Sequence, residues 1–151
     1  MARKKEAMAI SGEIQINYNW ALGKAGERFF SELRDNKKIM GSRCRKCDRI
    51  MVPPRIFCEE CFIEDTEWVE VEPRGTLVTF GDSFFSTDGK RLKEPWMLGI
   101  VRLHGSNGGL IHFINEARAE DLEIGMPMEI VFNKKRKGDI LDILYFRPEK
   151  K

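Results

Sequence analysis

The chain has 151 residues, which is enough for one domain or for two small ones. Its 26 basic and 24 acidic side chains leave a formal net charge of +2, so bulk charge does not indicate nonspecific binding to nucleic acid. Apolar residues make up 42% of the sequence, and the longest apolar stretches, such as Trp96–Val101, are too short to cross a bilayer. The composition therefore excludes a membrane span and predicts a modest core.

The N-terminal residues 1–17 show no apolar period, and we expect them to form a disordered arm. Three basic residues near the start are followed only by Ala7–Ile10, which is too short for the apolar core of an export signal. We therefore expect a cytoplasmic protein.

Residues 18–37 are expected to form an amphipathic helix, with Asn19 as its cap. Leu22, Phe29 and Leu33 recur at helical spacing, which indicates an apolar stripe on one face. Glycines inside the segment weaken the helix, so we expect it to depend on docking against the rest of the protein or a partner.

The four cysteines of the chain lie in two pairs, with two residues inside each pair and ten residues between the pairs. Two such pairs supply a tetrahedral thiolate site, and a reducing compartment favours a metal over disulfides. The predicted ligands of a structural zinc ion, one per chain, are Cys44, Cys47, Cys58 and Cys61. Iron in a rubredoxin-like site is the alternative. Asp48 and Phe62 follow the pairs where rubredoxin has glycine, so electron transfer is not expected.

Residues 38–72 are expected to form the metal ribbon, a unit too small to fold without its metal. Between Lys37 and Phe57 there are seven basic residues and one acidic residue, whereas Cys58 to Glu72 holds seven acidic residues and no basic one. The basic residues either offset the formal −2 of a zinc tetrathiolate or form a solvated face. Both interpretations fit the sequence.

Residues 73–151 are expected to form a small five-stranded barrel of the OB type. The predicted strands are Thr76–Ser83, Trp96–Leu103, Leu110–Asn115, Met128–Phe132 and Ile140–Phe146. Phe84–Glu94 is expected to be a polar loop, and Ala117–Leu122 a short helical segment before the fourth strand. Gly75 and Gly125 are interpreted as backbone requirements at turns. The predicted fold class is thus mostly β, with an N-terminal helix, a rubredoxin-like ribbon and a C-terminal OB-type barrel.

The chain carries none of the residue patterns that acyl-transfer or hydrolytic catalysis requires. With all four thiols committed to a metal, no cysteine is left as a nucleophile. His104 and His112 lie in or beside predicted strands, where a histidine is more often a strand-face residue than a catalyst. We therefore expect no catalytic residue in this chain.

A set of short motifs, in a fixed order, resembles a known family. The cysteine pairs enclose Pro53-Pro54-Arg55, Trp68 follows the ribbon, and Arg74-Gly75-Thr76 opens the barrel. The segment Glu120–Phe132 completes the order. Over about residues 18–147 the chain resembles the acyl-CoA-associated OB-fold family with an N-terminal rubredoxin-like zinc ribbon. It departs from the family at Asp48, where glycine is usual, and in the basic loop Asn133–Gly138.

This resemblance implies a partner and a substrate class that the residues alone do not show. Family members resemble non-catalytic subunits of thiolase-like enzymes, assembled with them as hetero-oligomers. Some hold or channel CoA thioesters, and one branch belongs to the β-oxidation-like degradation of aromatic acyl-CoAs. The resemblance therefore implies a thiolase-like catalytic partner and a CoA thioester. From the segment lengths and the charge distribution we expect no membrane contact, and nucleic acid is not the expected partner.

Several residues outside the ribbon are candidates for contact with CoA or with a partner protein. The basic run could meet phosphates or an acidic surface, or could only keep a loop tip soluble. Arg55 could pair with a phosphate or with an acidic residue of the second cysteine pair. Exposed aromatic residues could lie in an interface. The candidates are Arg55, Phe84, Phe85, Trp96, Lys134, Lys135, Arg136 and Lys137.

Two other functions fit the same elements. OB barrels and zinc ribbons both bind single-stranded nucleic acid, but that function needs a basic groove interleaved with aromatic side chains. Here the basic residues cluster at one predicted loop tip and one cysteine pair, next to the acidic stretch Glu59–Glu72. A stand-alone acyl-CoA carrier is the other alternative.

Overall fold

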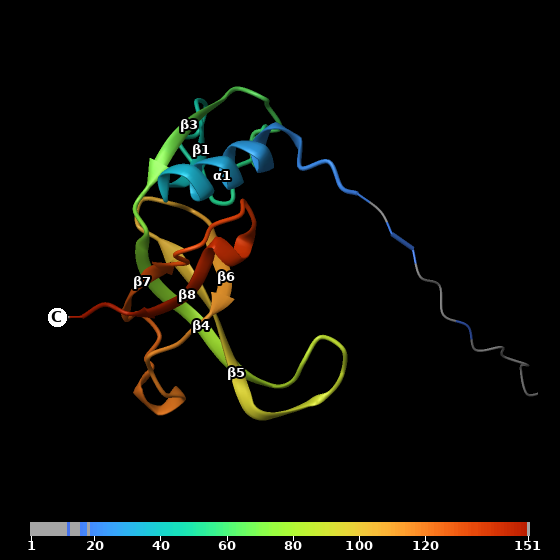
Figure 1. Ribbon diagram of the computed structural model, residues 1–151. Helices are drawn as coiled ribbons and strands as arrows, with labels where there is room; N and C mark the ends of the chain where they lie inside the picture. Colours follow the sequence, from blue (N-terminus) through green and yellow to red (C-terminus); the bar gives the residue numbers. More distant parts are fainter. Residues whose placement is uncertain (1–11, 13–15, 18, 151) are drawn as a thin grey trace, which may run out of the picture.

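The computed structural model describes residues 12, 16–17 and 19–150. The expected disordered arm, 1–17, therefore lies almost wholly outside the described residues. One helix and two antiparallel sheets make up the fold, and the helix lies with the ribbon strands at one end of the barrel (Figure 1). Within the described part of the chain, no helix is long and apolar enough to span a bilayer.

Helix α1 (Gly23–Asn36) begins later than the expected position near Asn19. Gly23 has a φ of 66°, a left-handed conformation that a continuous right-handed helix from Asn19 would not contain. Leu22 precedes the helix without a side-chain cap, so the predicted Asn19 cap is wrong. The predicted apolar stripe is present where the helix docks, because Phe29 and Leu33 are buried.

The ribbon sheet has the strand order β2-β1-β3, with β1 (Ile39–Cys44) in the centre. The edge strands are β2 (Ile50–Met51) and β3 (Thr66–Val71), both antiparallel to β1. Cys44 ends β1 and Cys47 lies in the turn to β2, whereas the second pair lies in the connection from β2 to β3. Both pairs consequently project from the same end of a short sheet.

The second sheet has the order β6-β5-β4-β7-β8. Its strands are β4 (Arg74–Phe85), β5 (Arg91–Leu103), β6 (Gly109–Phe113), β7 (Pro127–Phe132) and β8 (Ile143–Pro148). A parallel bridge between Ile114 and Phe146 brings the end of β6 to β8 and closes the sheet. With the 3-10 turn η1 (Ala119–Asp121) before the fourth strand, this confirms the predicted OB-type barrel.

The expected polar loop Phe84–Glu94 is mostly a continuation of strands β4 and β5. Phe85 pairs with Arg91, and only residues 86–90 form the turn, where Ser86 N–H donates to the Lys90 carbonyl at 2.9 Å. The resulting two-stranded hairpin extends from the barrel on the side away from α1 (Figure 1). The sequence predicted too long a loop, because charged residues of this segment occupy strand positions. Apart from the other strand of the hairpin, no strand of the sheet lies beside those positions.

The last predicted strand begins three residues late, because Ile140–Asp142 forms the 3-10 turn η2. Asp139 caps this turn by accepting the Leu141 N–H. Asp142 is 1% exposed, and its two carboxylate oxygens accept the N–H groups of Lys137 and Gly138 at 2.7 Å each. These bonds fold the β7–β8 connection into a compact loop instead of an extended hairpin.

One hydrophobic core joins the helix, the base of the ribbon and the barrel. It includes Phe29 of α1, Val52 and Val71 of the ribbon, and Leu77 and Phe146 of the barrel. The β5–β6 turn fastens the two sheets together, since Asn107 N–H donates to the Ile50 carbonyl at 2.8 Å and its side chain accepts the Ile50 N–H at 2.9 Å. The ribbon and the barrel therefore share apolar packing and backbone hydrogen bonds.

The backbone requires glycine at positions 75 and 125 for different reasons. Gly125 has a φ of 96°, as expected for a glycine at a turn. Gly75 instead lies inside β4, where a side-chain carbon would come within 2.2 Å of the Arg102 carbonyl oxygen. Gly75 is thus required because two backbone segments approach each other closely, and the prediction that it lies at a turn is wrong.

Candidate metal centre and surrounding surfaces

The two cysteine pairs form two knuckles with the same backbone hydrogen bonds. In the first, Asp48 N–H donates to the Cys44 carbonyl at 2.9 Å, and in the second, Phe62 N–H donates to the Cys58 carbonyl at 2.8 Å. Cys44 N–H and Cys58 N–H each donate to a carbonyl five residues further on, those of Arg49 and Ile63, both at 2.9 Å. Each knuckle therefore holds its two sulfurs on one side of a tight turn.

Left-handed residues complete both knuckles without glycine. Asp48 has a φ of 57° and Phe62 a φ of 53°. Glycine is favoured in this conformation because other residues bring their Cβ close to the backbone carbonyl. The departure from glycine at Asp48 thus leaves the knuckle geometry in place, with some backbone strain at both positions.

The four sulfurs lie within 4.8 Å of one another, and Cys47 Sγ is 3.7 Å from Cys58 Sγ. A tetrahedral zinc ion with Zn–S bonds of about 2.3 Å would separate its sulfurs by about 3.8 Å. Cys44 and Cys58 are buried, whereas Cys47 reaches the surface. The four cysteines are positioned to bind one metal ion, and the set fits zinc.

The thiols differ in how readily they ionise. Burial disfavours the Cys58 thiolate, but N–H groups of Cys61 and Glu60 and the neighbouring thiols lower the pKa of Cys58 to about 7. The Cys47 thiol, together with burial, raises the pKa of Cys61 to about 12. Neutral pH therefore leaves part of the cluster protonated, and a bound cation would displace those protons.

The basic residues near the first knuckle pair with the acidic residues that follow the second. Arg43 lies 3.6 Å from Glu67, Arg45 lies 3.6 Å from Asp65, and Arg49 lies 3.1 Å from Glu60. These pairs are largely exposed, so each contributes little to stability. The opposite charge blocks of the sequence are thus two halves of one ion-pair network around the knuckles.

Arg55 belongs to this network. Its guanidinium contacts Glu59, and its backbone N–H donates to Ser42 Oγ at 2.8 Å. Arg55 was expected to pair with a phosphate or with an acidic residue of the second knuckle, and in the structure it pairs with the acidic residue Glu59. A role of Arg55 in CoA binding stays a prediction.

The aromatic candidates lie on the barrel, away from the ribbon. Phe84 and Phe85 are 53% and 57% exposed on the β4–β5 hairpin. Trp96 lies on β5 and makes an edge-to-face contact with Phe113, with ring centroids 5.6 Å apart. These three are close to one another in the sheet, because Ser83, the residue before Phe84, pairs with Trp96.

The basic run Lys134–Lys137 does not lie at a free loop tip. Arg136 Nε donates to the Arg34 carbonyl at 2.7 Å, so its positive charge caps the C-terminal end of α1. Lys137 N–H is held by Asp142, whereas the side chains of Lys134 and Lys135 are exposed. The eight CoA or partner candidates therefore lie in three separate regions, and the binding role of each stays a prediction.

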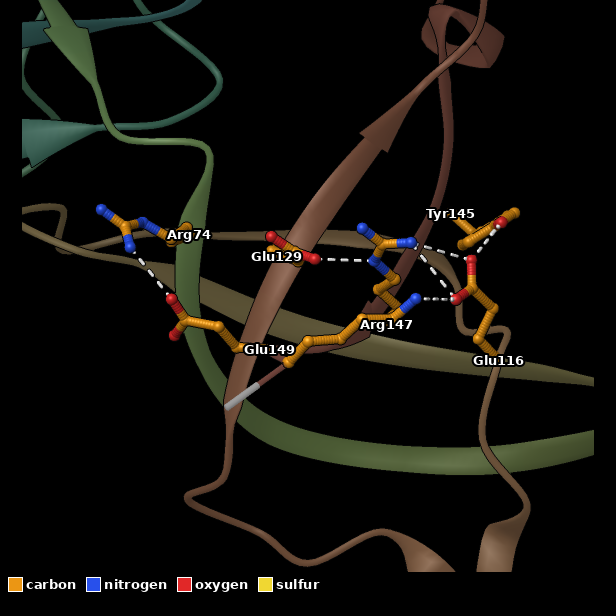
Figure 2. A network of polar contacts seen from close by, with 7 residues as sticks. Arg74, Glu116, Glu129, Tyr145, Arg147 and Glu149 are labelled. Atoms are coloured by element: carbon orange, nitrogen blue, oxygen red, sulfur yellow. Dashed lines mark hydrogen bonds and ion pairs between the residues drawn. The ribbon is translucent and has the colours of Figure 1, made fainter.

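Sequence reasoning missed a second polar network, on the barrel (Figure 2). Arg147 bridges Glu129 at 2.6 Å and Glu116 at 3.1 Å, and the Tyr145 hydroxyl donates to Glu116 at 2.7 Å. Hydrogen bonds from Tyr145 and Arg147 lower the pKa of Glu116 to about 2. Such a carboxylate is a poor general base at neutral pH, so the network joins the segment after β6 to β7 and β8 structurally.

Neither histidine lies in a catalytic arrangement within the described residues. His112 faces the barrel interior at 6% exposure, with Nε2 3.3 Å from the Ile140 carbonyl. His104 Nδ1 lies 3.9 Å from Glu72 on the surface. This placement matches the interpretation of both histidines as strand-face or surface residues.

The fold and the cysteine site together define a zinc-ribbon and OB-fold protein. Two family sequence models match in tandem: the rubredoxin-like zinc ribbon domain of ChsH2 over residues 32–67, and its C-terminal OB-fold domain over residues 68–133. Together they cover about two thirds of the 151 residues. The chain belongs to the ChsH2/DUF35 family, which confirms the resemblance drawn from its motifs.

Curated relatives support this membership. A DUF35 domain-containing scaffold protein of Methanocaldococcus jannaschii is 25% identical over 126 residues, which is 80% of this chain and 89% of that protein. The benzoylsuccinyl-CoA thiolase subunit BbsA of Thauera aromatica is 34% identical over 65 residues, 43% of this chain and 44% of BbsA. The match to BbsA thus covers less than half of either protein.

Solved structures share the fold. A DUF35-family protein of Sulfolobus solfataricus has a TM-score of 0.63 at 28% identity, covering 84% of this chain and 87% of that one. A chain of the Ltp2-ChsH2(DUF35) aldolase has a TM-score of 0.62 at 21% identity, and the match covers 86% of this chain and 98% of that chain. At that identity, the second likeness concerns the fold alone.

Proposed function

We propose that this chain is a non-catalytic scaffold subunit of a thiolase-type acyl-CoA enzyme. The observation that carries the proposal is the convergence of all four cysteines of the chain on one site. Thiolase chemistry transfers an acyl group through a cysteine thiolate, and a metal-bound set leaves no thiol for that step. The catalytic residues would then belong to the partner chain.

The names of two relatives support this assignment. BbsA is named as a thiolase subunit, and the Methanocaldococcus jannaschii relative is named as a scaffold protein. We expect this chain likewise to assemble with an enzyme and to carry no active site of its own. We expect the complex to be cytoplasmic and hetero-oligomeric.

Zinc would hold the ribbon in shape for this role. The S···S distance of 3.7 Å and the closed set of four thiolates support zinc as the resident ion, with iron as the alternative. A closed four-thiolate site has no open coordination position, so its role would be structural. The substrate class we propose is a CoA thioester, and the match to BbsA supports an aromatic acyl group.

The test is affinity purification of the tagged full-length chain from its source cell, with metal analysis of the same sample. We expect a thiolase-type chain in fixed ratio and one zinc ion per copy of this chain. Thiolase activity should require both chains, and the matched control is the partner expressed alone. Full activity of the partner alone, or purification of this chain without a thiolase-type chain, would overturn the proposal.

A stand-alone acyl-CoA carrier is a second candidate, favoured by one observation. A hollow of about 600 Å³ lies between β5, β6 and β8, lined by Trp96, Met97 and Leu144 among others. That volume is in the range of small-molecule sites. Calorimetric titration of the isolated chain with an aromatic acyl-CoA tests this candidate, and binding without a partner would favour it. Nucleic-acid binding has less support, because the arginines of the ribbon are engaged in ion pairs.

A further inference from the structure

The outer face of the sheet formed by strands β4, β5 and β6 is mostly apolar on β5 and β6 and carries small residues on β4. Antiparallel sheets with one solvated face usually alternate apolar and polar side chains, but Trp96–Val101 is apolar on both faces. Val101 and Leu103 of β5 point into the core, so Leu98 and Ile100 point outward. The outer face includes Thr79, Gly81 and Ser83 of β4, Trp96, Leu98, Ile100 and Arg102 of β5, and Ile111 and Phe113 of β6.

Cross-strand pairing makes this outer face continuous. Ile100 lies opposite Ile111, and Leu98 lies opposite Phe113 and, on its other side, opposite Gly81. Ile111 is 67% exposed, an unusual exposure for isoleucine inside a strand. A hollow of about 400 Å³ lies over the same strands, and a side chain added at Gly81 would meet no atom within 4 Å. Gly81 therefore leaves a depression in an apolar surface.

The single charged side chain on the outer face is Arg102. It makes no ion pair with any residue that the structure describes, in contrast to Arg43, Arg45 and Arg49 of the ribbon. No carboxylate occupies the positions of the outer face, so a second copy laid face to face would offer Arg102 no partner from the same positions. A different chain that supplies both apolar side chains and a carboxylate would cover this face, whereas a second copy would have to bring Asp88 or Glu94 of its hairpin to Arg102.

The outer face has the size of one part of a larger protein–protein interface. Three strands spaced by ~4.8 Å and five residues spaced by ~3.3 Å give an area of roughly 14 by 16 Å. A stable interface buries about 800 Å² on each partner, so these strands alone are too small. The β4–β5 hairpin adds the exposed rings of Phe84 and Phe85, one on each of its faces, and it extends away from the barrel (Figure 1).

We propose that the outer face of β4–β6, with the adjoining hairpin, is the surface that docks on the thiolase-type subunit. This inference rests on the proposed function and assigns its interface to the barrel rather than to the ribbon. The partner surface would be apolar at its centre and would carry a carboxylate opposite Arg102. Ile111 would enter the partner surface, and the hollow over Gly81 would receive a partner side chain.

The test uses the full chain and the thiolase-type chain that it brings down from the source cell. Two variants alter the outer face: Ile111→Glu places a charge at its centre, and Gly81→Arg fills the hollow. Ile124→Glu is the matched control, because Ile124 is also exposed, at 71%, and lies in the turn before β7. Binding is measured by calorimetry, with thermal unfolding of each isolated variant to establish that it folds.

We expect Ile111→Glu and Gly81→Arg each to weaken binding by about 30-fold or more, as for a central interface residue, and Ile124→Glu to leave it unchanged. Wild-type affinity in both outer-face variants would overturn this inference while leaving the proposed function intact. Absence of any thiolase-type chain from the wild-type purification would instead overturn the proposed function, and the assigned occupant with it. A homodimer that Ile111→Glu dissociates in light scattering would assign the outer face to a second copy.

Discussion

The tip of the ribbon and the rest of the molecule have different sources of stability. At the tip, the buried cluster contains only Cys44, Met51 and Cys58, with Cys61 and Ile63 packed against it. The main core, by contrast, extends from α1 through the base of the ribbon into the barrel. Burial of apolar area can hold the main core together, whereas the tip cluster is too small for that. We expect a bound metal to supply the difference at the tip.

The ion pairs around the knuckles do not change this comparison. They join the two halves of the tip, but their side chains are largely exposed, and exposed pairs contribute about 0–1 kcal/mol each. Their regular pairing of Arg43, Arg45 and Arg49 with acidic partners orients the knuckles. We therefore expect the metal-free tip to be locally unfolded while the barrel remains folded.

The largest expected effect is that of Cys58→Ser, which removes a buried ligand from the centre of the tip. Serine does not replace a thiolate on zinc, so bound metal should fall from one ion per chain to near zero. Hydrogen exchange of the backbone across residues 44–63 should then become fast, while exchange in β4 and β5 stays slow. Mass spectrometry of deuterium uptake, with metal analysis, measures both.

Removal of the metal by a chelator at neutral pH should reproduce the Cys58→Ser pattern. Acidification should do the same, because protonated thiols do not bind the ion. Global unfolding of the barrel in either experiment would mean that the two regions fold as one unit, contrary to the comparison.

Asp142→Asn tests the compact fold of the connection between β7 and β8. The buried carboxylate accepts two N–H groups, so an asparagine would turn its NH₂ toward one of them. The loss of one hydrogen bond and a donor facing a donor should destabilise the protein by about 2 kcal/mol. Asp139→Asn is the control, since the exposed Asp139 accepts one N–H, which asparagine can also accept. Equal urea midpoints for the two variants would contradict this role of Asp142.

His112 should make the stability of the barrel depend on pH. Burial lowers the pKa of His112, partly offset by the Ile140 carbonyl, and Nδ1 has no hydrogen-bond partner among the described residues. The unfolded chain therefore binds the proton first, near pH 6.5. The contribution of His112 to the free energy of unfolding is complete above pH 6.5. It is lost as the pH falls toward the lower pKa of His112 in the folded protein, by at most ~1.4 kcal/mol per pH unit.

The measurement for His112 is the difference in urea midpoint between wild type and His112→Gln from pH 8 to pH 5. Taking the difference removes the effect of metal loss, which is common to both proteins. His104→Gln, the same replacement at an exposed position, is the matched control. Parallel curves for wild type and His112→Gln would contradict the assignment.

Local spacing predicted the ribbon and the barrel because each depends on neighbours in the sequence. Two residues between cysteines define a knuckle, and alternating apolar residues define strands such as the predicted Met128–Phe132, which lies in β7. The docking of Arg136 on Arg34 was not predictable, because 102 positions separate the two residues. The network of Glu116, Glu129 and Arg147 was missed for the same reason.

The predicted ends of the helix and of the last strand were wrong where the conformation of a single residue overrides the propensity of the segment. Gly23 at a φ of 66° separates α1 from Asn19, and Asp142 bends the segment before β8 into a turn. The apolar run Trp96–Val101 did carry a signal, since a strand that is apolar on both faces predicts cover on both. The nature of that cover depends on a second chain, and no spacing within this sequence encodes it.

The smallest expected effect concerns the knuckles, where Phe62→Gly should stabilise the metal-loaded protein. Phe62 is 84% exposed with a φ of 53°, so its side chain packs little within the chain and its backbone is strained. Glycine would relieve that strain but lose more entropy on folding, for a net gain of about 0.5–1 kcal/mol. Asp48→Gly should gain less, because aspartate tolerates the left-handed conformation better than phenylalanine. Chelator competition measures both, and tighter metal binding in the wild type would mean that the Phe62 ring contributes more to the tip than its exposure indicates.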